Sequence, residues 1–182
     1  MRQTTIRQAA IRPQLIKFLT DATTHIYLAI GWMNDKGFVG LLEKKAAAGV
    51  VVKVILIDGA TNKKQKVAFQ KMTQQGVQII WLEKKYREIL IDHKFGVIDS
   101  NYVLTGNYVW GAKKGPKEDF LTISEDIPTL ANGFKEEFDY LSILNQLPKN
   151  EPKPINSISG LLRKLEILKV LLSIGDTEFI HL

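Results

Sequence analysis

Hydrophobic and polar positions alternate along the first half of the chain in blocks typical of an α/β fold. Continuous apolar runs at residues 25–30, 50–57 and 77–82 predict buried strands. Between them, residues 37–48 and about 62–75 carry apolar side chains at helical spacing, and each stretch is followed by a glycine. This order of strands and helices predicts β-α-β units, whose strands run parallel.

The flanking segments extend this pattern in both directions. Apolar side chains between residues 6 and 19 predict a helix before the first strand. Residues 90–98 and 102–110 are strand-like and separated by three turn-forming residues, so we expect an antiparallel hairpin. A strand at about 120–124 and a helix from 128 to about 146 follow. The predicted fold class is α/β, with a mixed, largely parallel sheet flanked by helices.

A proline-rich stretch divides the chain near its last fifth. Three prolines between residues 148 and 154 indicate a linker, and residues 159 to about 172 show a Leu-rich amphipathic pattern. We expect an α/β domain at residues 1–147, and a linker with one C-terminal helix at residues 148–182. That helix would pack back on the domain or meet a second subunit.

Composition and charge narrow the possible functions. The 182 residues include no cysteine, which excludes thiol catalysis, disulfides and thiolate zinc sites. The net charge of +6 favours an anionic partner such as nucleic acid or an anionic membrane surface. No run approaches the roughly 18 apolar residues of a membrane span, and no secretory signal is visible, so we expect a cytoplasmic protein. No nucleotide-binding glycine loop, zinc spacing or EF-hand loop occurs, so we expect neither a cofactor nor a metal.

The predicted hairpin carries the most informative motif. Lys94 is followed after four residues by Asp99, and a turn and an apolar strand then lead to Gly106, Trp110 and Glu118. This pattern resembles the phospholipase D superfamily, and within it the small single-motif bacterial domains related to its nucleases. Their motif reads His, any residue, Lys, four residues, Asp, followed by a Gly-Ser-x-Asn-Trp segment and a Glu-Asn pair. The resemblance covers about residues 7 to 145 and implies a phosphodiesterase fold.

Several residues depart from the family motif at the positions that carry its chemistry. The family's nucleophilic His, which forms a phosphohistidine, is replaced by Asp92. His93 would point to the other face of its strand unless a bulge turned it inward. Asn107, Val109 and Asp119 replace the motif's hydroxyl residue and its two Asn residues. We therefore expect weak or lost hydrolysis. The candidate catalytic positions are Asp92, Lys94, Asp99, Asn107 and Glu118, with His93 less favoured.

Two basic clusters flank the motif. Hairpin pairing would bring both clusters to the end of the sheet that holds Asp92 and Lys94, where they would bind phosphate groups or nucleic acid. Tyr86 and Trp110 could add stacking contacts, although core packing is the usual role of a strand Trp. Solvated loop charge is an equally good interpretation. The first cluster contains Lys84, Lys85 and Arg87, and the second contains Lys113, Lys114 and Lys117. Lys63, Lys64, Lys66 and Lys71 are expected on the solvated face of their helix.

Three functional hypotheses follow. The first, which we favour, is a phospholipase D-like domain with a degenerate site that binds phosphodiesters or nucleic acid. The second is an active phosphodiesterase of the nuclease type that uses Asp92 or a reoriented His93. The third is a dimerisation or interaction module that uses the Leu-rich helix. Because the family builds one site from two motifs and this chain has one, the resemblance also implies a homodimer.

Overall fold

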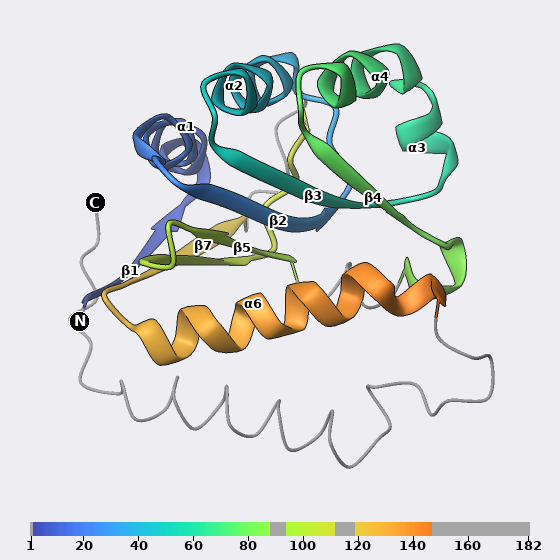
Figure 1. Cartoon of the computed structure of the whole chain (residues 1–182). Helices are drawn as coiled ribbons and strands as arrows, with labels where there is room; N and C mark the ends of the chain where they lie inside the picture. Colours follow the sequence, from blue (N-terminus) through green and yellow to red (C-terminus); the bar gives the residue numbers. More distant parts are fainter. Residues whose placement is uncertain (1, 88–93, 112–118, 147–182) are drawn as a thin grey trace.

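The described strands form one seven-stranded sheet, in the order β1-β7-β6-β5-β2-β3-β4 (Figure 1). The structure is a computed structural model that describes residues 2–87, 94–111 and 119–146. The strands are β1 (Arg2–Arg7), β2 (His25–Gly31), β3 (Val51–Ile57), β4 (Gln78–Leu82), β5 (Lys94–Ile98), β6 (Tyr102–Gly106) and β7 (Phe120–Glu125).

Helices cover both faces of this sheet. α1, α2 and α4 lie on one face and α6 lies on the other (Figure 1). The α-helices are α1 (Ile11–Asp21), α2 (Lys36–Ala47), α3 (Ala60–Lys63), α4 (Lys66–Gln74) and α6 (Pro128–Ile143). Short 3-10 turns are η1 (Gln8–Ala10), η2 (Lys84–Tyr86) and η3 (Leu144–Gln146).

Strand pairing confirms that the sheet is mixed, and it shows that only β2, β3 and β4 are parallel neighbours among the described strands. β2, β3 and β4 are parallel neighbours, as the β-α-β pattern predicts. β5 and β6 form the predicted antiparallel hairpin, and β5 also pairs antiparallel with β2. The β6-β7 and β1-β7 pairs are antiparallel as well. The sheet is therefore mixed and flanked by helices, but it is less parallel than expected, because each strand from β5 to β7 reverses the direction of the one before it.

Two elements differ from the sequence prediction. Residues 2–7, partly assigned to a helix, form the edge strand β1, and α1 begins only at Ile11. Ile6 is the one buried side chain of β1, so this strand shows little of the apolar alternation that marks a strand. The helix expected at 62–75 is split into α3 and α4, because the Asn62 side chain turns into the core and bonds the carbonyls of Gly31 and Ile57.

The hydrophobic core is divided by the sheet into two layers. One layer, under α1, α2 and α4, includes Leu28, Phe38 and Leu104. The other, under α6, includes Phe95, Val97 and Phe138. Side chains of β5 contribute to both layers in alternation, as a central strand must. This alternation decides which motif residues point toward the candidate site.

The C-terminal part of the prediction lies outside the described residues. The linker, the Leu-rich helix and the domain boundary at residue 147 therefore stay predictions. Among the described helices, none is long and apolar enough to cross a bilayer.

Candidate functional site

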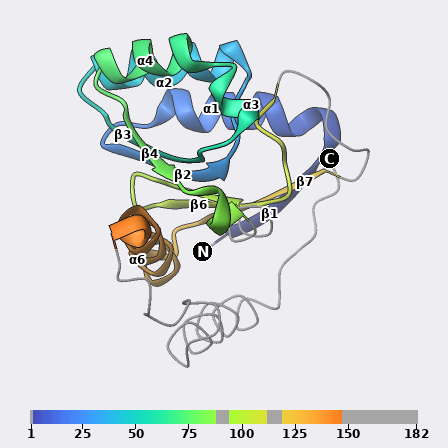
Figure 2. The same ribbon diagram turned by 90° about the vertical axis from the view of Figure 1, so that its right-hand side faces the viewer.

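One edge of the sheet collects Lys94, Asn107 and Asp119, three of the motif positions that the structure describes. The parallel strands β2, β3 and β4 all end at this edge. Because β5, β6 and β7 alternate in direction, β5 begins here, β6 ends here and β7 begins here. Lys94, Asn107 and Asp119 therefore meet at the carboxyl edge of the parallel strands, where open α/β sheets bind their ligands. Figure 2 looks onto this edge, with α3 toward the viewer.

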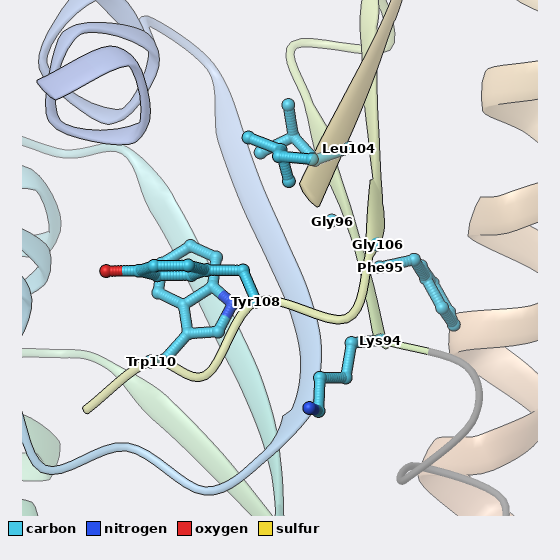
Figure 3. Close-up of a pocket in the computed structure, with 8 residues that line it drawn as sticks. Lys94, Phe95, Gly96, Leu104, Gly106, Tyr108 and Trp110 are labelled. Carbon is cyan, nitrogen blue, oxygen red and sulfur yellow. The ribbon is translucent and has the colours of Figure 1, made fainter. Parts of the chain in front are cut away.

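Lys94 is the half-buried cation of this edge. It is the first residue of β5, and its Nζ donates a hydrogen bond to the carbonyl oxygen of Asn107 at 3.1 Å. Its side chain and that of Phe95 leave the strand on opposite sides, and Phe95 packs on Phe134 of α6 (Figure 3). Lys94 thus projects toward the α1 and α2 side of the sheet. The hollow beside it is lined by Phe95, Gly96, Leu104, Gly106, Tyr108, Trp110 and Leu121.

Asn107 connects the end of β6 to the start of β7 through a side-chain hydrogen bond. Its Oδ1 accepts a hydrogen bond from the backbone N–H of Phe120 at 2.8 Å. The backbones approach so closely here that a Cβ at Gly106 would lie 2.3 Å from the Phe120 carbonyl oxygen, so only glycine fits. The main-chain carbonyl of Asn107 thus accepts a hydrogen bond from Lys94, and the side-chain amide oxygen of Asn107 accepts one from the first residue of β7. Asn107 therefore acts as a positioning residue within the described structure.

Asp119 is a site residue that sequence reasoning noted only as a departure from the motif. It directly precedes β7, is 4% exposed, and its Oδ1 has no hydrogen-bond partner among the described residues. Burial raises the pKa of the Asp119 carboxyl, and the positive charge of Lys94 offsets part of the rise. Its position next to Glu118 was the available sequence signal, but burial of the carboxyl arises from the tertiary fold.

The aromatic residues of the motif are structural. Trp110 is 4% exposed and packs against Phe38, with the two ring centroids 4.8 Å apart. Its carbonyl oxygen accepts a hydrogen bond from the Asn34 N–H at 3.0 Å, which ties this segment to the end of β2. The expected stacking of Trp110 on a nucleotide is therefore wrong for this structure, and its usual core role holds. Burial also raises the pKa of the neighbouring Tyr108 hydroxyl, with a further contribution from Asp35.

An ion pair supports the site from the α1 and α2 side. Arg12 donates two hydrogen bonds to Asp35, at 2.9 and 3.1 Å. Asp35 also caps α2 by accepting hydrogen bonds from the backbone N–H groups of Gly37 and Phe38. The Arg12 guanidinium holds the pKa of the Asp35 carboxyl below its ordinary value, against the opposing effect of burial. The Asp35 carboxylate therefore has a structural role, as the partner of Arg12 and the N-cap of α2.

Asp99 lies at the opposite edge of the sheet from Lys94. The two residues are separated by the length of β5, about 16 Å at 3.3 Å per residue. The Asp99 carboxylate instead accepts hydrogen bonds from the backbone N–H groups of Thr23, Thr24 and His25 at 2.8 to 3.0 Å. Burial alone would raise the pKa of Asp99, but these bonds outweigh it and hold the pKa far below its ordinary value. Asp99, one of the candidate catalytic positions, therefore stabilises the start of β2 and lies too far from Lys94 to pair with it.

The first basic cluster lies at the same edge as Lys94. Lys84, Lys85 and Arg87 are exposed in and after η2, which follows β4. The Lys85 Nζ pairs with Glu83 at 2.8 Å, and the Tyr86 hydroxyl donates to the Leu144 carbonyl at 3.3 Å. The remaining candidates, Asp92, His93, Glu118, Lys113, Lys114 and Lys117, lie outside the described residues. Within the described ranges, no group of three or more His, Asp or Glu residues could hold a metal ion.

Comparisons with known proteins agree with this geometry. The family model described as "Cardiolipin synthase, PLD-like domain" matches residues 15–142. No curated protein matches. Nuc from Salmonella typhimurium, a phospholipase D family member, has a TM-score of 0.65 at 16% identity, over 80% of this chain and 93% of Nuc.

Two further solved structures share the fold. NucT from Helicobacter pylori has a TM-score of 0.64 at 14% identity, over 77% of this chain and 94% of NucT. Polyphosphate kinase from Porphyromonas gingivalis has a TM-score of 0.64 at 12% identity, over 83% of this chain and 27% of the kinase. At these identities the structural likeness shows the fold alone.

Proposed function

The chain belongs to the phospholipase D superfamily, in the family described by the PLD-like domain of cardiolipin synthase, and we propose that it binds phosphodiester groups at the Lys94 edge with weak or no hydrolysis. The ligand we favour is nucleic acid. The observation that carries this proposal is the placement of the Lys94 ammonium at the carboxyl edge of the sheet, held there by the Asn107 carbonyl.

Weak hydrolysis follows from the side chains that replace the family's reactive groups. Asp92 occupies the position of the nucleophilic His, and a carboxylate there would repel a phosphate oxygen. The Asn107 side chain is already bonded to the Phe120 N–H. His25 is the one histidine within the described residues, and it lies at the opposite edge, where its N–H pairs with Asp99. These substitutions leave the phosphate-neutralising Lys94 in place and remove its reactive neighbour.

A binding titration tests this proposal. Fluorescence anisotropy with labelled DNA and RNA oligonucleotides at two salt concentrations, with and without EDTA, compares the wild type with Lys94→Ala. Lys44→Ala is the matched control, because Lys44 is an exposed lysine at the other end of α2. We expect salt-dependent binding that Lys94→Ala weakens about tenfold and Lys44→Ala leaves unchanged. Equal affinities for all three proteins would contradict the proposal.

One observation favours an active phosphodiesterase as the second candidate. Asp119 combines burial, a raised pKa and proximity to Lys94, which are properties of a residue that donates a proton to a leaving oxygen. If the chain cleaves phosphodiesters by this route, Asp119→Asn abolishes cleavage and leaves binding intact. An Asp92→His variant that gains activity over an inert parent would count against this second candidate.

We also propose that the chain acts as a homodimer, with both Lys94 side chains facing one cleft. The support is the single motif in a family that pairs two motifs per site. Sedimentation equilibrium of the full chain tests this: a mass of twice 20.6 kDa supports the dimer, and a monomer at all concentrations excludes it.

A further inference from the structure

Basic side chains follow each parallel strand at the edge that holds Lys94. Lys36 follows β2, Lys64 follows β3 and Lys84 follows β4, and all three are exposed. The segments that carry them lie at the edge seen in Figure 2, where α3 faces the viewer. Lys64, expected on the solvated face of a long helix, instead lies at the junction between the short helices α3 and α4.

The charges of this edge are only partly compensated. Two acidic side chains that are exposed there pair with neighbouring lysines: Asp58 with Lys63 at 3.2 Å, and Glu83 with Lys85 at 2.8 Å. No carboxylate among the described residues forms a salt bridge with Lys36, Lys64 or Lys84.

The opposite edge has a different character. Asp99 and Asp126 occupy its turns, and the hydroxyls of Thr23 and Thr24 line the start of β2. Of the lysines near that edge, Lys45 donates to the Ala22 carbonyl at 2.8 Å and Lys17 pairs with Asp21 at 2.6 Å, whereas Lys44 is exposed and forms no salt bridge with a described residue. Among the described residues, more lysines without a salt bridge therefore lie at the edge of Lys94 than at the opposite edge, where Lys44 is one.

These lysines belong to segments that follow four neighbouring strands, so the positive charge extends across the edge and is not confined to one point. Neighbouring strands lie about 4.8 Å apart, so the path from β5 across β2 and β3 to β4 spans about 14 Å. One strand of a duplex carries a phosphate for roughly every 3.4 Å of helix axis, so a duplex segment whose axis covers this distance brings about four phosphates of that strand to the edge. A single phosphodiester group is much shorter than this path, so it could not contact the lysines of all four segments.

We infer that a polynucleotide backbone lies along this edge, from Lys94 across the segments that follow β2, β3 and β4, with Lys36, Lys64 and Lys84 as its phosphate contacts. This inference rests on the proposed function and extends it. It makes the ligand a polynucleotide several phosphates long, and it assigns the binding path to lysines outside the motif. It also predicts that affinity grows with ligand length up to about the span of four phosphates.

The test compares ligand lengths and charge-reversal variants of the full chain. Anisotropy titrations use single-stranded DNA of two, four and twelve nucleotides at two salt concentrations. The variants are Lys64→Glu combined with Lys84→Glu, the control Lys44→Glu on the opposite edge, and Lys94→Ala. Thermal melting of each variant verifies that it is folded.

We expect the double reversal to weaken binding of the twelve-nucleotide ligand at least tenfold and to lower the salt slope by about 1.4, or 0.7 per lost phosphate contact. Its effect on the dinucleotide should be small, and Lys44→Glu should resemble the wild type. A double reversal that matches Lys44→Glu would overturn the inference, as would an affinity independent of length. Lys94→Ala distinguishes this inference from the proposed function. If Lys94→Ala abolishes binding and the double reversal has no effect, the proposed function stands and the inference about the three lysines is wrong.

Anionic vesicles of phosphatidylglycerol provide the competing ligand. If the vesicles bind the wild type, the double reversal abolishes that binding, and DNA binds with no dependence on length, the edge is a membrane contact and the polynucleotide assignment is wrong.

Discussion

At the residue scale, three carboxyl groups of the motif region have three different roles. Asp35 is paired with Arg12 and caps α2. Asp99 closes the start of β2 through hydrogen bonds to its backbone. Asp119 is buried, interacts with the charge of Lys94, and has one oxygen without a hydrogen-bond partner in the described part of the chain. The first two roles concern stability, and only the third concerns the candidate site.

Asp99→Asn should lower the free energy of unfolding by about 2 kcal/mol at pH 7, because the amide is uncharged and its NH2 group faces backbone donors. The pKa of Asp99 lies below its unfolded value, so its stabilisation is present above about pH 4 and is lost as the pH falls. Urea unfolding at pH 7 and pH 3 should therefore show a difference that narrows at pH 3. Asp126→Asn is the control, since Asp126 also has a positive φ but its carboxylate accepts no backbone hydrogen bond from the residues that the structure describes. Equal losses in the two variants would contradict this role.

Asp119→Asn should raise the free energy of unfolding at pH 7 by roughly 1 kcal/mol, because it removes a buried charge whose Oδ1 accepts no hydrogen bond from the described residues. The pKa of Asp119 is raised in the folded state, so the destabilisation by its charge appears only as the pH rises and disappears below the ordinary pKa near 4. Urea unfolding of both proteins from pH 3 to pH 8 measures this. A variant less stable than the wild type at pH 8 would show that the Asp119 charge is stabilised in the fold.

At the scale of elements, the sequence predicted the parts of the fold whose apolar pattern is strong. The buried strands β2, β3 and β4 and the hairpin of β5 and β6 were found in their correct order. β1 was missed because it is an edge strand with one buried side chain, and the break after α3 was missed because it depends on the buried amide of Asn62. Lys94 was found from motif spacing. The buried environment of Asp119 could not be predicted from the sequence, because it forms only where β5, β6 and β7 come together in the folded chain.

The Asn145 side chain, in the η3 turn directly after α6, forms hydrogen bonds at the end of β4. The Asn145 Nδ2 donates to the Trp81 carbonyl at 2.6 Å, and its Oδ1 accepts from the Glu83 N–H at 3.2 Å. We expect Asn145→Ala to lower the free energy of unfolding by about 1 to 2 kcal/mol, with faster hydrogen exchange at Glu83. Gln70→Ala, an exposed substitution on α4, is the control. An unchanged Glu83 exchange rate would contradict this role for Asn145.

At the scale of the whole molecule, sheet topology gives the two edges different chemistry. The carboxyl edge of the parallel strands gathers Lys94, Asp119 and the exposed lysines that follow β2, β3 and β4. The opposite edge consists of turns stabilised by Asp99. The family's fold is retained around the site, while the residue at the nucleophile position is Asp92. The sheet topology supports the proposed binding of a polyanion at this edge, and the proposed weakness of hydrolysis rests on Asp92 at the nucleophile position.

The most direct test measures binding and cleavage of one labelled oligonucleotide in the same reaction, with protein in excess. We predict that the wild type binds the oligonucleotide in a salt-dependent manner, that Lys94→Ala weakens this binding, and that the oligonucleotide is recovered intact. Complete cleavage that Lys94→Ala abolishes would contradict the account of a degenerate site. Binding that is unaffected by Lys94→Ala would contradict the location of the site itself.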